Sequence, residues 1–169
     1  MSAIFSECGL FRYRLEREGL PTGIVIAYLG VNGATAGPVK NDHTVTKWHG
    51  FTLLSKGRRM IVGNPFAFCA TNVRELAMAV DPVGPDNDVH LAQIIADADL
   101  LVPGWGPRTK VPKRLRYRYD EVEAMLVASG KPMKCFGLSK SGDPLHPLIL
   151  GYNTPLVDWQ PASALALAE

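Results

Sequence analysis

Hydrophobic residues along the chain fall into short continuous runs, separated by longer segments in which apolar and polar positions mix. The runs 24–29 and 59–63 contain β-branched residues and predict strands buried on both faces. Residues 100–102 and 131–138 predict two further strands. Residues 10–15 partly alternate apolar with basic side chains, a pattern typical of a half-buried strand.

Near-helical spacing of apolar residues marks the segments between these strands. Residues 43–56 predict a helix on the spacing of Val45, Trp48 and Leu53, with Asp42 available as its N-cap. Further helices are predicted over residues 71–80, from residue 85 through an apolar stripe ending at 95, and over 119–128, whereas residues 148–150 look strand-like.

Strands and helices therefore alternate with short connections, which predicts an α/β three-layer sandwich. Its centre would be a mostly parallel sheet of about four strands, with an N-terminal strand or hairpin added. We predict a single domain over residues 1–160 and a loose, Ala-rich C-terminal tail over residues 161–169. Because such folds bind ligands outside the carboxyl ends of their strands, the loops of interest are 30–42, 64–71, 104–118 and 139–147.

Composition places the chain among globular proteins. Its 169 residues are 47% hydrophobic and 20% charged, which suits one domain with an ordinary core. The apolar runs are far shorter than the roughly 20 residues of a membrane span, and no secretory pattern opens the chain. Cys8, Cys69 and Cys135 are scattered, so we expect neither disulfides nor a cysteine zinc site. We therefore expect a cytoplasmic protein without membrane association; its oligomeric state stays open.

Charge is distributed unevenly. The net charge is +2, but residues 107–118 carry six basic residues and no acidic one, which leaves 12 basic against 16 acidic residues elsewhere, a net −4. Cations with a nearby tyrosine suit contact with phosphates and bases; the alternative is a solvated face beside the acidic start of the next helix. The six residues are Arg108, Lys110, Lys113, Arg114, Arg116 and Arg118.

Two of the predicted loops contribute a candidate catalytic pair, Asn32 and His146. An asparagine can position a water molecule, and a histidine can donate a hydrogen bond to an oxygen that gains negative charge. This combination suits hydrolysis of an N-glycosidic bond. The alternative is that Asn32 satisfies backbone groups of a tight turn.

Other loop residues suggest ligand contacts. Phe66, Phe68 and Trp105 follow predicted strands and could line a slot for a flat base; the alternative is that they belong to the core. The stretch Gly137-Leu-Ser-Lys-Ser-Gly142 could wrap a phosphate with its backbone amides and Lys140, or could be a polar turn. The carboxylate and imidazole groups lack the spacing of a metal site, and no cofactor motif is present, so we expect neither metal nor cofactor.

Seven blocks of the sequence resemble, in the same order, a bacterial and phage family known as domain of unknown function 1643. One block is Asn64-Pro-Phe-Ala-Phe followed at 70–71 by Ala-Thr, and another is His146-Pro147-Leu148. The resemblance covers nearly the whole chain, about residues 8–159, and its blocks are residues 8–15, 32–44, 64–71, 81–88, 105–106, 137–142 and 146–148.

A more distant resemblance is to the uracil-DNA glycosylase superfamily. Gly30-Val-Asn32 looks like the start of its motif Gly-x-Asn-Pro-Gly, and His146-Pro147 looks like the start of its motif His-Pro-Ser. This resemblance implies a glycosylase-like fold, water positioning by Asn32, leaving-group stabilisation by His146, and base binding by Phe66 or Phe68 with Asn64. The sequence departs from the superfamily at Gly33, Ala34 and Leu148, where the motifs have Pro, Gly and Ser.

The residues and the resemblance together predict a nucleobase-recognising protein that acts on DNA or nucleotides by hydrolysing an N-glycosidic bond, with a flipped or modified base as substrate. Two other functions remain open at this point. One is a non-catalytic nucleic-acid-binding accessory protein of a phage or bacterium, and the other is an enzyme of small-molecule nucleotides.

Overall fold

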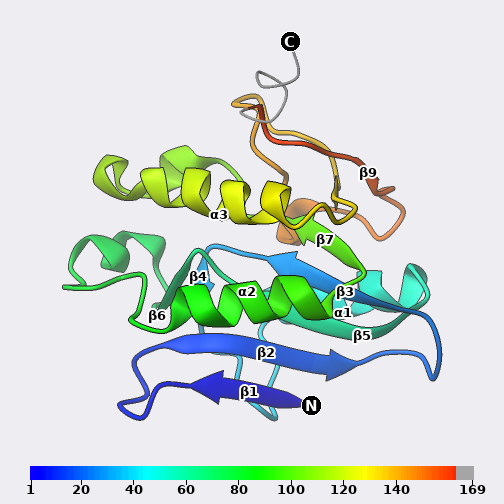
Figure 1. Ribbon diagram of the computed structural model, residues 1–169, viewed down its shortest axis with the longest axis horizontal. Helices are drawn as coiled ribbons and strands as arrows, with labels where there is room; N and C mark the ends of the chain where they lie inside the picture. Colours follow the sequence, from blue (N-terminus) through cyan, green and yellow to red (C-terminus); the bar gives the residue numbers. More distant parts are fainter. Residues whose placement is uncertain (163–169) are drawn as a thin grey trace.

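The computed structural model describes residues 1–162, and its centre is a five-stranded mixed sheet in the order β1-β2-β5-β3-β7 (Figure 1). Strand β3 pairs in parallel with both β5 and β7, whereas β2 runs antiparallel to β5 and β1 runs antiparallel to β2. The strands are β1 (Ser2–Phe5), β2 (Arg12–Glu18), β3 (Ile24–Leu29), β5 (Gly57–Gly63) and β7 (Leu100–Pro103).

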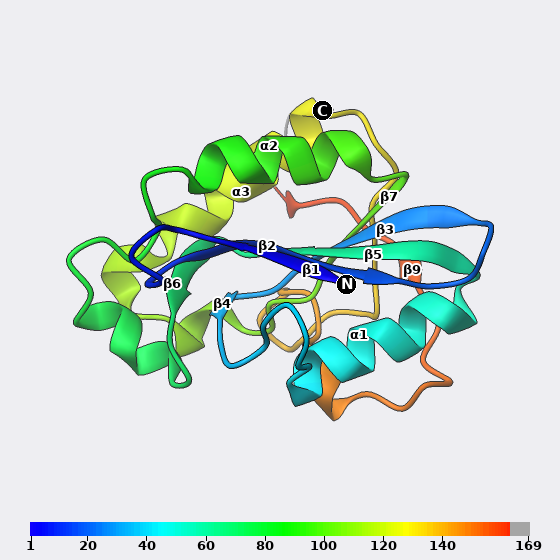
Figure 2. The same ribbon diagram turned by 90° about the horizontal axis from the view of Figure 1, so that it is seen from below.

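Helices cover both faces of this sheet. Helix α1 (His43–Leu54) lies on one face, and α2 (Asn87–Asp97) and α3 (Tyr117–Ala128) lie on the other (Figure 2). Two hydrophobic clusters result, one centred on Trp48 and Phe51 of α1 and the other on α2 and α3. The α/β class and the helix over 43–54 are confirmed, including the Asp42 cap, whose carboxylate accepts a hydrogen bond from the Val45 amide at 2.8 Å.

The sheet itself differs from the expectation, because it is mixed rather than mostly parallel and has five strands. The predicted strand over 131–138 shrinks to β8 (Lys134–Cys135), which pairs with β9 (Val157–Asp158) outside the main sheet. Beside β7 it leaves one isolated bridge, from Met133 to Leu101. Pro132 and the positive φ of Gly137 bracket the segment and stop a longer ladder.

Two short segments also differ from their predictions. Residues 71–80 contain a 3₁₀ helix, η1 (Val73–Ala77), which Asn72 and Glu75 close with a capping box. The strand-like residues 148–150 belong largely to the 3₁₀ turn η4 (Pro147–Ile149). Four more elements complete the description: the small parallel pair β4 (Asn32–Gly33) and β6 (Phe66–Cys69), and the 3₁₀ turns η2 (Arg108–Lys110) and η3 (Lys113–Leu115).

The register of the sheet brings four chain segments to one edge. Leu29 pairs with Gly63 on one side and with Pro103 on the other, so three neighbouring strands end at the same level. Strand β2 runs the opposite way, with Leu15 opposite Val62, and therefore brings its first residues to this edge. The carboxyl ends of β3, β5 and β7 and the amino end of β2 therefore lie at this edge of the sheet.

Within residues 1–162, no helix is long and apolar enough to cross a membrane. The predicted tail over residues 161–169 lies, from residue 163 onward, outside the described residues.

Candidate functional site

Two adjoining cavities, of about 240 and 380 Å³, open beyond the carboxyl ends of β3, β5 and β7. Four residues line both cavities: Val31, Val73, His146 and Leu148. We call the smaller cavity the polar lobe, because its wall also includes Arg12, Asn32, Asp42, Thr44, Trp48 and Asn64. We call the larger one the apolar lobe, because its wall also includes Trp105, Pro107, Val111, Tyr119, Leu145 and Ile149.

Asn32 begins the short strand β4, which follows β3. Its side-chain NH₂ group donates to the carbonyl oxygens of Gly33 at 2.7 Å and Ala70 at 2.6 Å. Both amide hydrogens are therefore engaged, and the orientation of the side chain is fixed. The Oδ1 atom remains as an acceptor on the residue that lines the polar lobe.

Asn64 follows β5 directly and is 3% exposed. Its backbone carbonyl accepts a hydrogen bond from Asn87, whereas its side-chain amide makes no hydrogen bond to another residue within the described range 1–162. Gly30 makes room for this amide, because a Cβ at Gly30 would lie 2.6 Å from Asn64 Oδ1 and 2.9 Å from the Trp48 ring. The glycine after β3 thus allows an amide and an indole to form one cavity wall.

His146 stands where the two lobes meet. Its Nδ1 atom accepts a hydrogen bond from the Leu148 amide at 3.4 Å, which leaves Nε2 to carry the proton of the neutral ring. Burial lowers the pKa of His146 from its usual 6.5 to about 4; the nearby Lys110 charge lowers it further, and Asp42 opposes both. The ring is therefore a neutral N–H donor at neutral pH.

Arg12 and Trp48 line the polar lobe, although the sequence pattern did not single them out for this role. Arg12 is 3% exposed and donates to the Ala36 carbonyl at 2.8 Å. Burial lowers its pKa, and the Asp42 carboxylate across the lobe opposes that shift. Trp48 stands 6.3 Å from the His146 ring, centroid to centroid. Its helical spacing correctly predicted burial, but no sequence signal marked it as a cavity wall.

The aromatic residues predicted to stack on a base are placed differently. Phe66 is fully buried in the core against Tyr119, and Phe68 packs on Phe11. In the described part of the chain, neither phenylalanine lines a lobe. Pairing of β6 with β4 explains this, because it turns Phe66 toward the core under α3. The aromatic walls come instead from Trp48 in the polar lobe and from Trp105 and Tyr119 in the apolar lobe.

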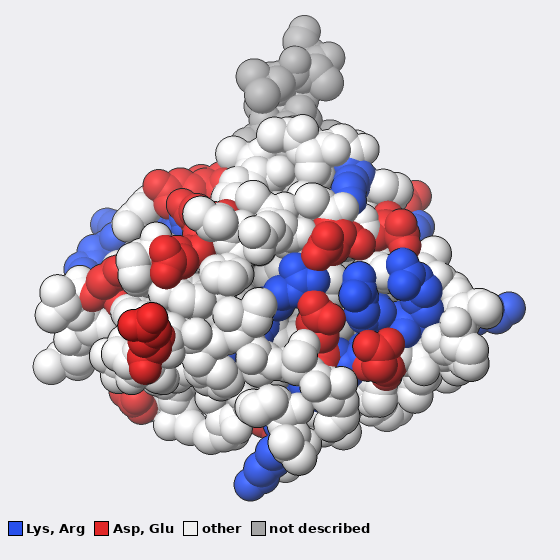
Figure 3. Space-filling model, turned by 60° about the horizontal axis from the view of Figure 1, so that its bottom comes forward, with Lys and Arg blue, Asp and Glu red and all other residues white. Residues whose placement is uncertain are grey.

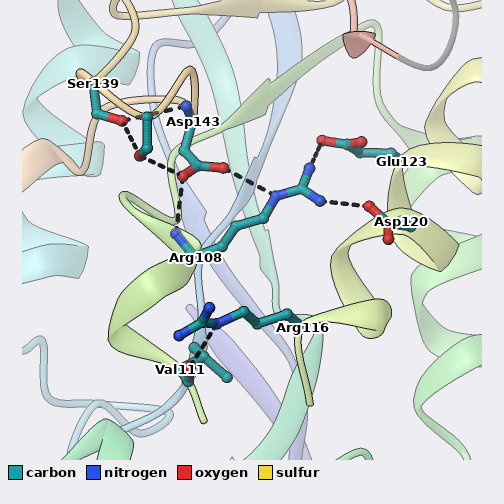
Figure 4. A network of polar contacts seen from close by, with 8 residues as sticks. Arg108, Val111, Arg116, Asp120, Glu123, Ser139 and Asp143 are labelled. Carbon is teal, nitrogen blue, oxygen red and sulfur yellow. Dashed lines mark hydrogen bonds and ion pairs between the residues drawn. The ribbon is translucent and has the colours of Figure 1, made fainter. Parts of the chain in front are cut away.

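The basic segment, residues 108–118, is largely engaged within the protein (Figure 4). Arg108 contacts Asp120 at 2.5 Å, Asp143 at 3.0 Å and Glu123. Asp120 and Glu123 belong to the acidic start of α3. Their hydrogen bonds and charges outweigh the effect of burial and raise the pKa of Arg108. Its charge is thus balanced by three carboxylates.

Arg118 is likewise engaged in contacts within the protein. It is 2% exposed, pairs with Asp88 and Glu121, and donates to the Pro65 carbonyl at 3.0 Å. A guanidinium this buried cannot reach an external phosphate without unfolding the start of α3. We therefore interpret Arg108 and Arg118 as structural rather than ligand-binding residues.

The other cations of the segment are nearer to solvent. Arg116 donates to the backbone carbonyl of Val111 at 3.0 Å, and Arg114 donates to that of Ala77 at 2.6 Å. Lys113 is exposed, and Lys110 lines the apolar lobe. These four side chains remain candidates for phosphate contact at the rim of the cleft.

The turn over residues 137–142 also differs from a phosphate loop. Lys140 is exposed, but two serines of the turn make hydrogen bonds within the protein. Ser141 donates to Asp143 Oδ2 at 2.8 Å, and the Asp143 amide donates to Ser139 Oγ at 3.2 Å. The amides of Ser139 and Gly142 donate to backbone carbonyls of the same turn and are therefore already engaged.

Surface charge gives no single basic field on the face shown in Figure 3, where Lys and Arg side chains stand among Asp and Glu side chains. Among residues 1–162, no group of three or more His, Cys, Asp or Glu side chains is arranged to hold a metal ion.

Comparison with protein families gives one match. The family model described as "Protein of unknown function (DUF1643)" matches residues 12–148, most of the chain, so the protein belongs to this family. The matched range runs from Arg12 to Leu148 and contains every lining residue named for the two lobes except Ile149. Comparisons with curated proteins and with solved structures return no match.

Proposed function

We propose that this DUF1643 protein recognises a nucleobase in the polar lobe and hydrolyses the N-glycosidic bond of the nucleotide unit that carries it. The observation that carries the proposal is the convergence of Asn32, Asn64 and His146 on one cavity. They come from three separate chain segments, and each has a hydrogen-bonding group left over after its contacts within residues 1–162. Unengaged polar groups on a concave wall are typical of small-molecule sites.

Recognition would rest on Asn64 and Trp48. An asparagine amide offers a donor and an acceptor side by side, which matches the adjoining carbonyl and N–H groups on the edge of a base. The indole of Trp48 supplies a flat wall, and Gly30 lets the two side chains stand close together.

Catalysis would rest on Asn32 and His146. Asn32 Oδ1 accepts a hydrogen bond from a water molecule whose oxygen bonds to C1′ of the sugar. The C1′–N bond breaks, its electron pair passes to the base, and the proton that the water loses ends on the departing base. The Nε2–H group of His146 donates to the base oxygen on which negative charge develops.

A neutral His146 suits this role. With a pKa of about 4, the ring is uncharged at neutral pH and does not transfer a proton as an imidazolium would. Its N–H group can still donate a hydrogen bond, and because the ring is already oriented, it need not move during the reaction. Protonation of Nδ1 would also set a donor against the Leu148 amide and break the hydrogen bond that orients the ring.

The proposal includes a relationship to the uracil-DNA glycosylase superfamily. The order of the two motifs along the chain supports it, with Asn32 after β3 and His146-Pro147 after the last helix. Both motifs line the same cavity, although Gly33, Ala34 and Leu148 differ from the superfamily's residues.

One observation favours a small nucleotide over duplex DNA as the substrate. Arg108 and Arg118 are neutralised within the fold, which leaves fewer cations at the rim for a DNA backbone than the sequence suggested. Non-catalytic binding of a nucleobase is the second candidate function, and the test below separates it from hydrolysis.

The test is release of free base by the purified protein from nucleosides, nucleoside monophosphates and single- and double-stranded DNA containing uracil, damaged or modified bases. We expect Asn32→Ala and His146→Ala each to lower the rate by roughly 100- to 1,000-fold. The matched controls Asn153→Ala and His43→Ala change exposed residues and should leave the rate unchanged. Binding without base release would select the second function, and undiminished release by both cavity variants would remove these catalytic assignments.

A further inference from the structure

We propose that Arg12 forms a subsite for an anionic group, a phosphate or a carboxylate, on the ligand of the polar lobe. The inference deepens the proposed function and rests on it for the nucleobase part of the ligand. The anion subsite itself rests on Arg12 alone, so the two proposals can fail separately.

The buried arginines of this protein differ in how far their N–H groups are used. Arg14 donates to Glu16 and Asp97, Arg17 to five oxygen acceptors, and Arg118 to two carboxylates and a carbonyl. Arg12 makes one hydrogen bond, to Ala36, and no ion pair with any residue of the described range 1–162. Four of its five N–H donors are therefore unused.

A buried guanidinium without an ion pair is costly, and the charge of Asp42 offsets the desolvation of Arg12 only in part. Arg12 is nevertheless buried, with only 3% of its surface exposed. It forms part of the wall of the polar lobe. A bound oxyanion would supply the missing partner. The planar guanidinium can donate two parallel hydrogen bonds to a phosphate or a carboxylate, which makes arginine well suited to such groups.

The other charged groups around the lobe are compatible with this assignment. Asp42 is the one carboxylate on its wall within the described residues, and it accepts the Val45 amide at the start of α1. Lys110 stands near His146 and adds positive charge. The amino end of α1 also faces the lobe through Thr44 and Val45, which favours negative charge there. Asn64, unpartnered and buried in the same wall, marks the lobe as a built polar site.

The test compares neutral and anionic ligands by calorimetry at constant ionic strength. The probes are a nucleoside, its 5′-monophosphate, the free base, the same base bearing a carboxylate, and inorganic phosphate. We expect the better anionic ligand to bind wild-type protein roughly 10- to 100-fold more tightly than its neutral parent. Whether the phosphate or the carboxylate gives the preference identifies the source of the anion.

Arg12→Gln should abolish this preference and leave binding of the neutral parent within about twofold. Arg12→Lys keeps the charge without the planar guanidinium and should retain part of the preference. Arg58→Gln, which removes an exposed arginine at the opposite end of β5 from the lobe, is the matched control and should retain all of it. Because Arg12→Gln removes an unpaired buried charge, we expect its Tm to be no lower than that of the wild type.

Equal affinity of wild-type protein for neutral and anionic ligands would overturn the subsite and leave the proposed function standing. Phosphate binding that depends on Arg12, without binding of any base, would support the subsite and overturn the proposed function. A large fall in Tm in both Arg12 variants would overturn the subsite, because it would show that Arg12 is a structural residue.

Discussion

The basic segment, residues 108–118, and the polar lobe hold their charged and polar groups in opposite ways. In the basic segment, Arg108 and Arg118 between them contact five carboxylates and contribute to the packing of α3. Figure 4 shows the three carboxylates around Arg108. In the polar lobe, Arg12 and Asn64 are as deeply buried but have few partners or none among the described residues. The charge of the first region was conspicuous in the sequence, whereas the lack of partners for Arg12 and Asn64 was not.

The difference teaches that a concentration of charge is a weaker guide to function than a buried group without a partner. Charges that are close in sequence can each find a counterion once the chain folds. A buried donor that the protein leaves unpaired costs stability, so its presence points to a ligand. The comparison therefore predicts that substitutions in the basic segment lower stability, whereas substitutions in the polar lobe chiefly lower ligand affinity.

The largest stability effect should come from Arg108→Met. The substitution leaves Glu123 and Asp143 without their cation, and their side chains are only 6% and 10% exposed. We expect the free energy of unfolding to fall by about 3 kcal/mol at pH 7. Urea denaturation measures it, with Lys113→Met, at an exposed position, as a control that should stay within about 0.5 kcal/mol. Equal stability of Arg108→Met and wild type would contradict the view that the basic segment contributes to stability.

The next effect concerns His146 and pH. Its folded-state pKa of about 4 lies below its usual 6.5, so between these values the unfolded chain binds a proton that the folded chain does not. Stability therefore falls as the pH drops from 6.5 toward 4, by on the order of 2 kcal/mol from this residue. His146→Gln should remove that part of the pH dependence, measured as the difference in unfolding free energy between variant and wild type.

In the same pH series, His43→Gln changes an exposed histidine and should reproduce the wild-type curve. A curve for His146→Gln that runs parallel to the wild-type curve from pH 4 to 7 would show that His146 is not held neutral.

The smallest of these effects should come from Gly30→Ala. The added methyl group would meet Asn64 Oδ1 at 2.6 Å and the Trp48 ring at 2.9 Å, so the wall of the polar lobe must shift. We expect a stability loss of about 1 kcal/mol and a larger proportional loss of ligand affinity. Gly37→Ala is the matched control, because a Cβ at Gly37 meets no atom within 4 Å. Unchanged ligand affinity in Gly30→Ala would show that Asn64 and Trp48 do not contribute to ligand binding.

Local patterns predicted much of the fold and part of the site. The apolar runs gave β3, β5 and β7, and the Asp42 cap gave the start of α1. Because parallel strands end at one edge, the sequence also predicted that Asn32 and His146 would approach one another, and both line the polar lobe. These features depend on residues close in sequence or on general rules of α/β topology.

Arg12 could not be predicted as a site residue, because its position depends on strand direction. The sequence predicted an added N-terminal strand or hairpin without its direction, and a parallel strand would have placed Arg12 at the edge opposite the ligand loops. The antiparallel pairing of β2 with β5 reverses this and brings Arg12 to the site. Nothing in residues 10–15 specifies that direction, which depends on the partner strand.

The ion-pair partners of the basic segment also could not be predicted from local patterns. Arg108 pairs with Asp143, which is 35 positions away, and Arg118 pairs with Asp88, which is 30 positions away. Only the pairings of Arg108 with Asp120 and of Arg118 with Glu121, at the acidic start of α3, follow from neighbouring sequence. Phe66 and Phe68 were likewise predicted to stack on a base because they follow a strand. Pairing of β6 with β4 instead directs Phe66 into the core.

Assembly of the polar lobe from both ends of the family-matched range has a consequence for folding. Arg12 and His146 meet at one cavity, so the lobe is complete only after contacts of very high sequence separation have formed. A ligand that binds there recognises the folded chain and not its fragments, and through mass action it stabilises the sheet and all the helices together. A rise in Tm of the intact protein can therefore reveal a ligand before any reaction is known, and loss of that rise in a polar-lobe variant would assign the ligand to this cavity.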